Sequence, residues 1–148
     1  MKYGCIGEKL SHSFSREIHS LLADYPYELC EVARGDLYSF MHRAEFTAIN
    51  VTLPYKETVI GYLDEIDEYA RLIGAVNTVV KRNGKLYGYN TDFYGMVSLL
   101  EHAKIDVKGK KALVLGSGGT AKTARSVLTH LGARDVITVG RQIGRAHV

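Results

Sequence analysis

The chain has 148 residues, of which 46% are apolar and 24% charged, and its net charge is +3. This composition is ordinary for a globular protein, and the length suits one domain or a small domain plus part of another. The basic residues are spread along the chain, which argues against a nucleic-acid-binding protein, and no apolar run approaches the roughly 20 residues of a membrane span.

The first half of the chain alternates between strand and helix patterns. Strands are predicted over residues 2–6, 27–32, 46–52, 76–81 and 85–89, and helices over 13–22, 35–43, 58–73 (in two pieces, with an acidic outer face) and 92–102. Asn83-Gly84 is the preferred dipeptide of a tight hairpin turn, and Asp92 suits the N-cap of the last of these helices.

The composition changes at residues 105–111, which are polar and basic and indicate a linker. A nearly all-apolar strand follows over 112–115, as expected for a strand buried on both faces. A helix over 120–131 and a strand over 136–139 complete a βαβ pattern. The sequence therefore predicts an α/β fold with two domains, residues 1–104 and the opening of a second domain over 105–148.

The last residues fit neither a helix nor a strand. The segment IGRAHV that ends the chain resembles translated read-through of a sequencing adapter. We therefore expect that residues from about 142 are not native sequence, that the protein continues, and that nothing functional lies in this tail.

The loop at residues 116–121 has the pattern of a dinucleotide-binding turn. It follows an apolar strand, opens a helix and consists of Gly116, Ser117, Gly118, Gly119, Thr120 and Ala121. Glycines there permit a tight turn and let backbone N–H groups approach a pyrophosphate at the helix N-terminus. A plain strand-to-helix turn is the alternative. The next strand ends without the acidic residue typical of NAD binding, and Arg141 favours the 2′-phosphate of NADP, unless it is simply a solvated arginine.

Two charged residues could form a proton-transfer pair. Lys56 follows the proline of Asn50–Lys56, and Asp92 lies 36 residues later at the start of a helix. A lysine can donate or accept a proton when burial or a neighbour tunes it, and a carboxylate can hold its ammonium group. Histidine and cysteine spacings indicate no metal site.

Three other polar side chains are ambiguous from their type alone. Ser11 and Ser13 could bind a carboxylate or a polyol, or could cap the helix that follows. Asn77 could be a turn residue or could present its amide to a ligand.

Five motifs occur in the order and with the spacing of one enzyme family: SHSxS (11–15), NVTLPYK (50–56), GAVNT (74–78), GYNTDxxG (88–95) and GSGGTA (116–121). By these motifs the chain resembles the shikimate dehydrogenases, over nearly its whole length to about Arg141. The resemblance implies an α/β substrate-binding domain followed by a truncated Rossmann-type NADP-binding domain, with substrate between the two.

The resemblance also implies roles for single residues. Lys56 and Asp92 would be the catalytic pair, with Asn50 and Thr91 as supports, and the loop over 116–121 would hold the NADP pyrophosphate. The shikimate carboxylate and hydroxyls would be held by Ser11, Ser13, Thr52, Lys56, Asn77 and Asp92.

The implied activity is the reversible NADP-dependent reduction of 3-dehydroshikimate to shikimate, on the pathway to chorismate and aromatic amino acids. A non-catalytic shikimate- or quinate-binding module, or a quinate/shikimate dehydrogenase relative, is the alternative. We expect this truncated chain to be inactive alone. The unpaired Cys5 and Cys30, and a start that lacks a signal-peptide pattern, predict a cytoplasmic protein. The spread of its basic residues and the lack of a long apolar run predict no nucleic-acid or membrane partner, and a homodimer is possible.

Overall fold

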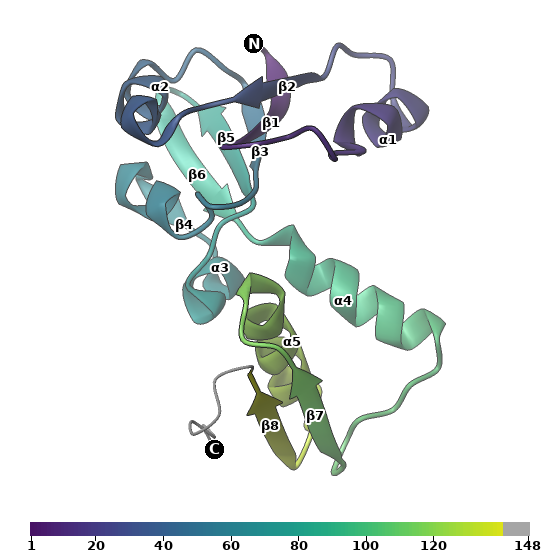
Figure 1. The fold of residues 1–148 in the computed structure, drawn as a ribbon. Coiled ribbons are helices and arrows are strands. Elements are labelled where there is room, and N and C mark those ends of the chain that lie inside the picture. Colours follow the sequence, from purple (N-terminus) through teal and green to yellow (C-terminus); the bar gives the residue numbers. More distant parts are fainter. Residues whose placement is uncertain (141–148) are drawn as a thin grey trace. The chain divides into compact units, whose positions relative to one another are not determined.

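The computed structural model describes residues 1–140, and their contacts form two compact units, Met1–Asn90 and a second that begins at Thr91. The strands of the first unit are β1 (Tyr3–Gly7), β2 (Glu28–Glu31), β3 (Ala48–Val51), β4 (Glu65–Ile66), β5 (Thr78–Arg82) and β6 (Lys85–Tyr89). Its helices are α1 (Ser15–Leu22), η1 (Arg34–Asp36), α2 (Leu37–Arg43), η2 (Thr58–Tyr62) and α3 (Glu68–Ile73) (Figure 1). The predicted α/β class is confirmed.

The six strands form one mixed sheet in the order β2-β1-β3-β5-β6-β4. β1 is parallel to both β2 and β3, whereas β5 is antiparallel to β3. The ends of β1 and β3 therefore meet the start of β5 at the same edge of the sheet, which we call the site edge. The loops that leave or enter this edge carry most of the polar residues predicted to bind a ligand.

The predicted hairpin is confirmed between β5 and β6. Asn83 and Gly84 both have positive φ, 51° and 78°. Two successive left-handed residues give the turn whose twist matches paired antiparallel strands, and glycine and asparagine adopt that conformation at the lowest cost. This turn fixes the register Val80↔Tyr87 and so the face on which each β5 side chain lies.

The two faces of the sheet carry separate apolar clusters. The larger one joins Ile6 and Val79 of the sheet to Met41 of α2, Val59 of η2 and Ala70 of α3, all nearly fully buried. The smaller one, on the other face, contains Cys5, Leu10 and Tyr27. Alternation along β1 produces this division, since Cys5 and Ile6 point to opposite faces.

The segment predicted as a helix in two pieces over residues 58–73 does contain two helical pieces, η2 and α3. The short strand β4 between them was not predicted, and it pairs in parallel with β6. Two acidic residues of this segment have structural roles: Asp64 Oδ2 accepts a hydrogen bond from Leu86 N at 2.7 Å, and Asp67 Oδ1 accepts one from Ala70 N at 2.7 Å. Asp67 is therefore the N-cap of α3.

Replacing Asp67 with alanine is expected to lower the free energy of unfolding by about 1 kcal/mol, because the first turn of α3 loses its side-chain acceptor. Urea denaturation measures the change. Glu68→Ala is the matched control, since Glu68 is exposed in the same turn. Equal destabilisation by the two substitutions would contradict the capping role.

The second unit contains α4 (Thr91–His102), β7 (Lys111–Leu115), α5 (Gly119–His130) and β8 (Asp135–Val139). β7 and β8 are parallel and both contact α5, which confirms the predicted βαβ pattern (Figure 1). The expectation that residues 112–115 are buried on both faces was wrong. Leu113 and Leu115 are 61% and 78% exposed, because the described sheet has only two strands and one helix packs on it.

Two other predictions concern α4 and the point in the sequence at which the first unit ends. α4 begins at Thr91, so Asp92 lies inside its first turn and is not the N-cap that the sequence predicted. The contacts divide the chain after Asn90, which assigns α4 to the second unit. The functional boundary predicted between residues 104 and 105 stays a prediction.

Candidate functional site

The site edge is held together by close backbone contacts between three loops. Thr52 N donates to Ile6 O at 2.9 Å, and Glu8 N donates to Leu53 O at 3.2 Å. A Cβ atom on Gly7 would lie 2.7 Å from Thr52 Cγ2 and 3.1 Å from Leu53 O. Glycine at this position therefore lets the loop after β1 lie directly against the loop after β3.

Lys56 belongs to the same edge. Its carbonyl oxygen accepts a hydrogen bond from Val76 N at 2.7 Å, which joins the loop after β3 to the loop before β5. Burial raises the pKa of the Cys5 thiol, while the nearby Lys56 ammonium opposes that rise. The lysine side chain is thus close enough to act electrostatically on the face of the sheet that carries Cys5.

Tyr55 anchors the loop that carries Lys56. Its side chain is 2% exposed, and its hydroxyl donates to Val32 O at 2.5 Å. A buried aromatic ring with a satisfied hydroxyl is a strong packing element. The loop that carries Thr52 and Lys56 is therefore fixed to the end of β2.

The serine loop after β1 is also tied to the sheet. Leu10 N donates to the Glu31 carboxylate at 2.8 Å, and Ser13 N donates to Leu10 O at 2.9 Å. Ser13 does not occupy the N-cap of α1, which is Phe14, but its hydroxyl oxygen accepts from Ser15 N at 3.3 Å. Ser11 is exposed on this loop.

Asn77 is buried, at 7% exposure, where the chain enters β5. Its backbone is fixed by Val51 N, which donates to Asn77 O at 2.8 Å, and by Asn77 N, which donates to Tyr89 O at 3.0 Å. Its Oδ1 accepts from the Thr78 hydroxyl at 3.1 Å. The structure therefore places Asn77 between β3 and β6, with a defined amide orientation.

The sequence did not reveal two members of the surrounding polar network, Tyr27 and Thr78. The Tyr27 hydroxyl donates to Asn50 Oδ1 at 2.6 Å, and Asn50 Nδ2 donates to Thr78 Oγ1 at 3.1 Å. Asn50 and Thr78 are cross-strand partners in the β3–β5 register. Their proximity depends on strand pairing, and no local pattern in the sequence indicates it.

The glycine loop of the second unit has the geometry that its pattern predicts. Gly116 has φ of +119°, a conformation that favours glycine, and Gly118 is the N-cap of α5 without a side-chain hydrogen bond. Cβ atoms on Gly116, Gly118 or Gly119 would meet nothing within 4 Å, so the backbone is open to an approaching group. A phosphate suits these helix N-terminal N–H groups.

The predicted site residues thus fall into two groups. Lys56, Thr52, Asn77 and the loop with Ser11 and Ser13 lie at the site edge of the first unit. The second unit contains Asp92, which is exposed on α4, and the glycine loop, in which Ser117 and Thr120 are exposed and Ala121 is half-buried. The pairing of Lys56 with Asp92 stays a prediction, and Arg141 lies outside the described residues.

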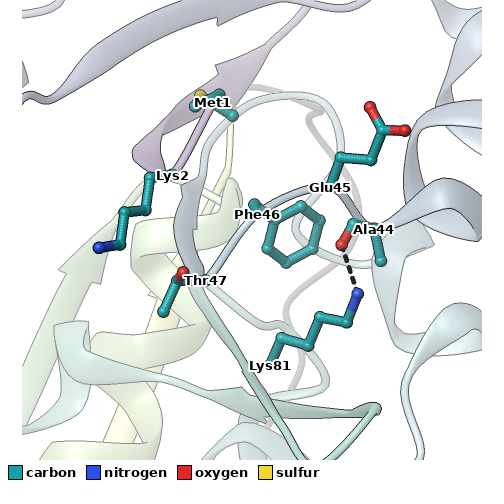
Figure 2. Close-up of a pocket in the computed structure, with 7 residues that line it drawn as sticks. All are labelled: Met1, Lys2, Ala44, Glu45, Phe46, Thr47 and Lys81. Carbon is teal, nitrogen blue, oxygen red and sulfur yellow. Dashed lines mark hydrogen bonds between the residues drawn. The ribbon is translucent and has the colours of Figure 1, made fainter.

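A surface hollow of about 470 Å³ lies at the opposite edge of the sheet. Figure 2 shows its lining, which comes from the start of β1, the loop before β3 and the end of β5. Lys81 Nζ donates to Ala44 O at 2.8 Å, and Ala44 is the left-handed residue that ends α2. Lys81 thereby satisfies a carbonyl at a helix C-terminus, which gives this lysine a structural role.

Among residues 1–140, no group of three or more histidine, cysteine, aspartate or glutamate side chains could hold a metal ion. No helix within the same range is long and apolar enough to cross a membrane.

A mixed-sheet unit with a polar edge, followed by a parallel βαβ unit with a glycine-rich turn, is an arrangement typical of the Rossmann-type class of α/β proteins. The family model described as "Shikimate dehydrogenase substrate binding domain" matches residues 5–79. The chain belongs to this family, which confirms the resemblance read from its motifs.

Individual relatives agree with this assignment. The chain is 42% identical to the "Shikimate dehydrogenase (NADP(+))" of Clostridium beijerinckii, over 95% of this chain and 55% of the relative. Shikimate dehydrogenase 1 from Peptoclostridium difficile has a TM-score of 0.88 at 38% identity, with 100% of this chain and 58% of that chain covered. The enzyme from Thermus thermophilus, solved in complex with NADP(H) and shikimate, has a TM-score of 0.84 at 33% identity over 96% of this chain and 56% of that chain. The chain thus spans about half the length of the curated relatives it matches.

Proposed function

We propose that this chain is the substrate-binding part and the start of the cofactor-binding part of an NADP-dependent shikimate dehydrogenase. Its reaction is the reversible reduction of 3-dehydroshikimate to shikimate, on the route to chorismate and aromatic amino acids. The observation that carries the proposal is the site edge, where the predicted ligand-binding residues of the family segment 5–79 gather on three loops joined by hydrogen bonds.

Shikimate offers a carboxylate and hydroxyl groups, and the site edge offers matching donors. Ser11 and Ser13 lie on the loop after β1, Thr52 lies on the loop after β3, and Asn77 enters β5. Hydroxyl and amide groups recognise such a ligand by directional hydrogen bonds, and a buried polar pocket rejects analogues that leave its groups unpaired.

Lys56 is the group that exchanges a proton with the reacting oxygen. In the reductive direction its ammonium group donates a proton to the oxygen that becomes the shikimate hydroxyl, and in the oxidative direction its amine accepts that proton. Asp92 orients the lysine and holds its charge, with Asn50 and Thr91 as supports. Lys56 is half-buried in the loop after β3, at the site edge, which supports this role.

The glycine loop over residues 116–121 fits a pyrophosphate, because its backbone is open and precedes the first turn of α5. Bound NADP supplies the hydride chemistry. Ser117 lies beside the end of β8, since a Cβ on Gly140 would lie 3.3 Å from its Oγ. Arg141, the next residue, is the proposed partner of the 2′-phosphate.

The direct test is shikimate-dependent reduction of NADP⁺, followed by the absorbance of the NADPH that forms. It is run on this chain and on a version extended to the full length of its relatives. Turnover by the extended version alone is the expected result. Shikimate binding without turnover in either version would instead favour the non-catalytic binding module, and turnover with quinate in preference to shikimate would favour the quinate-type relative.

A cytoplasmic location and assembly into a homodimer are also part of the proposal. Cys5 is buried, Cys30 is partly buried, and both are free thiols, which supports a reducing cytoplasm. A homodimer is tested by analytical ultracentrifugation of the extended protein.

A further inference from the structure

Tyr27 is a buried tyrosine immediately before β2 whose hydroxyl reaches toward the site edge. Its side chain is 8% exposed, and the His19 ring of α1 stacks on it with centroids 3.8 Å apart and planes at 12°. Its hydroxyl donates to Asn50 Oδ1 at 2.6 Å. Burial raises the pKa of Tyr27, and Cys5 and Tyr25 add to the rise, so the phenol keeps the proton that it donates.

This donation and a backbone carbonyl together set the orientation of the Asn50 amide. Asn50 Oδ1 accepts from the phenol, and the NH₂ group donates to Thr78 Oγ1 at 3.1 Å and to Asn77 O at 3.4 Å. The Thr78 hydroxyl then donates its own proton to Asn77 Oδ1, at 3.1 Å. With Oδ1 turned toward Thr78, the amide N–H groups are the part of Asn77 that can donate to a ligand hydroxyl or carboxylate.

The phenol therefore stands at the head of a hydrogen-bonded chain that runs through Asn50 and Thr78. The chain ends at Asn77, which is a predicted ligand-binding residue.

We propose that Tyr27 is a positioning residue that orients Asn77 for the substrate without contacting it. This inference rests on the proposed function only for the identity of the ligand. Without the phenolic hydroxyl, Asn50 can flip its amide, and Thr78 can donate to Asn50 instead of to Asn77. The amide of Asn77 then loses its fixed orientation, and the site loses part of its complementarity to hydroxyl and carboxylate groups.

The first test is the affinity of this chain for shikimate, measured by isothermal titration calorimetry. Tyr27→Phe keeps the ring stacked on His19 and is expected to weaken binding about fivefold to tenfold, the loss typical of one or two hydrogen bonds. Tyr25→Phe is the matched control, because the Tyr25 hydroxyl is also hydrogen-bonded, to His19 Nδ1 at 2.5 Å, but lies outside the chain from Tyr27 to Asn77. It is expected to bind within twofold of the unmodified protein.

The second test follows the side-chain amide signals of Asn50 and Asn77 by ¹H–¹⁵N NMR without ligand. Tyr27→Phe is expected to shift both pairs of signals, and Tyr25→Phe neither pair. Because this readout needs no substrate, it tests the orientation of Asn77 independently of shikimate binding and of the proposed function.

Thr78→Val breaks the same chain at another link and keeps the test decisive if Tyr27→Phe folds poorly. Each single variant is expected to weaken shikimate binding, and the double variant to bind no more weakly than the worse single one, since both interrupt one chain. Additive losses, unchanged affinity in Tyr27→Phe, or unmoved Asn77 signals would overturn the inference.

Discussion

Replacing Lys56 with alanine is expected to lower kcat for shikimate oxidation about 10²- to 10⁴-fold in the extended protein, the range for loss of a general acid–base group. The dissociation constant for shikimate is expected to rise less than tenfold, because Thr52, Asn77 and the serine loop keep their positions. Steady-state kinetics measures kcat, and calorimetry measures the dissociation constant.

Lys85→Ala controls for the loss of one positive charge. Lys85 is exposed and opens β6 at the edge of the sheet opposite the site edge. It is expected to leave kcat within twofold. Turnover close to that of the unmodified protein in Lys56→Ala would remove Lys56 from the proton-transfer role and turn attention to Asp92.

Replacing Gly4 with alanine is expected to lower the free energy of unfolding by about 3 kcal/mol, at the upper end for overpacking. A Cβ atom there would lie 2.3 Å from Glu28 O, a backbone atom of the paired strand β2, and 2.3 Å from Met1 Sδ. The flexible methionine can move aside, but the carbonyl can move only if the β1–β2 pairing shifts. Urea denaturation followed by circular dichroism measures the loss.

Gly61→Ala is the matched control for this stability change. A Cβ on Gly61 meets nothing within 4 Å, and its φ is not positive. Its unfolding free energy is expected to change by no more than about 0.5 kcal/mol. A Gly4→Ala variant as stable as Gly61→Ala would show that β1 and β2 pair less closely than described.

Local signals in the sequence predicted the parts of the fold that depend on neighbouring residues. Asn83-Gly84 specified its hairpin because the turn needs two left-handed residues in succession. The glycine loop specified the junction of β7 and α5 for a similar reason. By contrast, β4 was missed, because a two-residue strand is held by its pairing with β6 and leaves no periodicity in the sequence.

The residues of the candidate site also divide into those that local motifs identified and those that they did not. Lys56, Asn77 and the serines were recognised through motifs, whereas Tyr27 and Thr78 were not identified as part of the network. Tyr27 meets Asn50 across 23 positions of sequence, and Asn50 meets Thr78 across 28. Such contacts follow from the order and register of the strands, which residue types alone do not specify.

The strand order also has a consequence for the sequence of events in folding. The β5–β6 hairpin is local and can form within microseconds. By contrast, β1 pairs with β2 and β3, which follow it in the chain only after the helical connections α1 and then η1 and α2, so these contacts form more slowly. During synthesis, the amino-terminal strands leave the ribosome before β5, the partner that flanks β3 in the completed sheet. We therefore expect the sheet of the first unit to form late. In that step β3 pairs with β1 on one side and with β5 of the earlier-formed hairpin on the other.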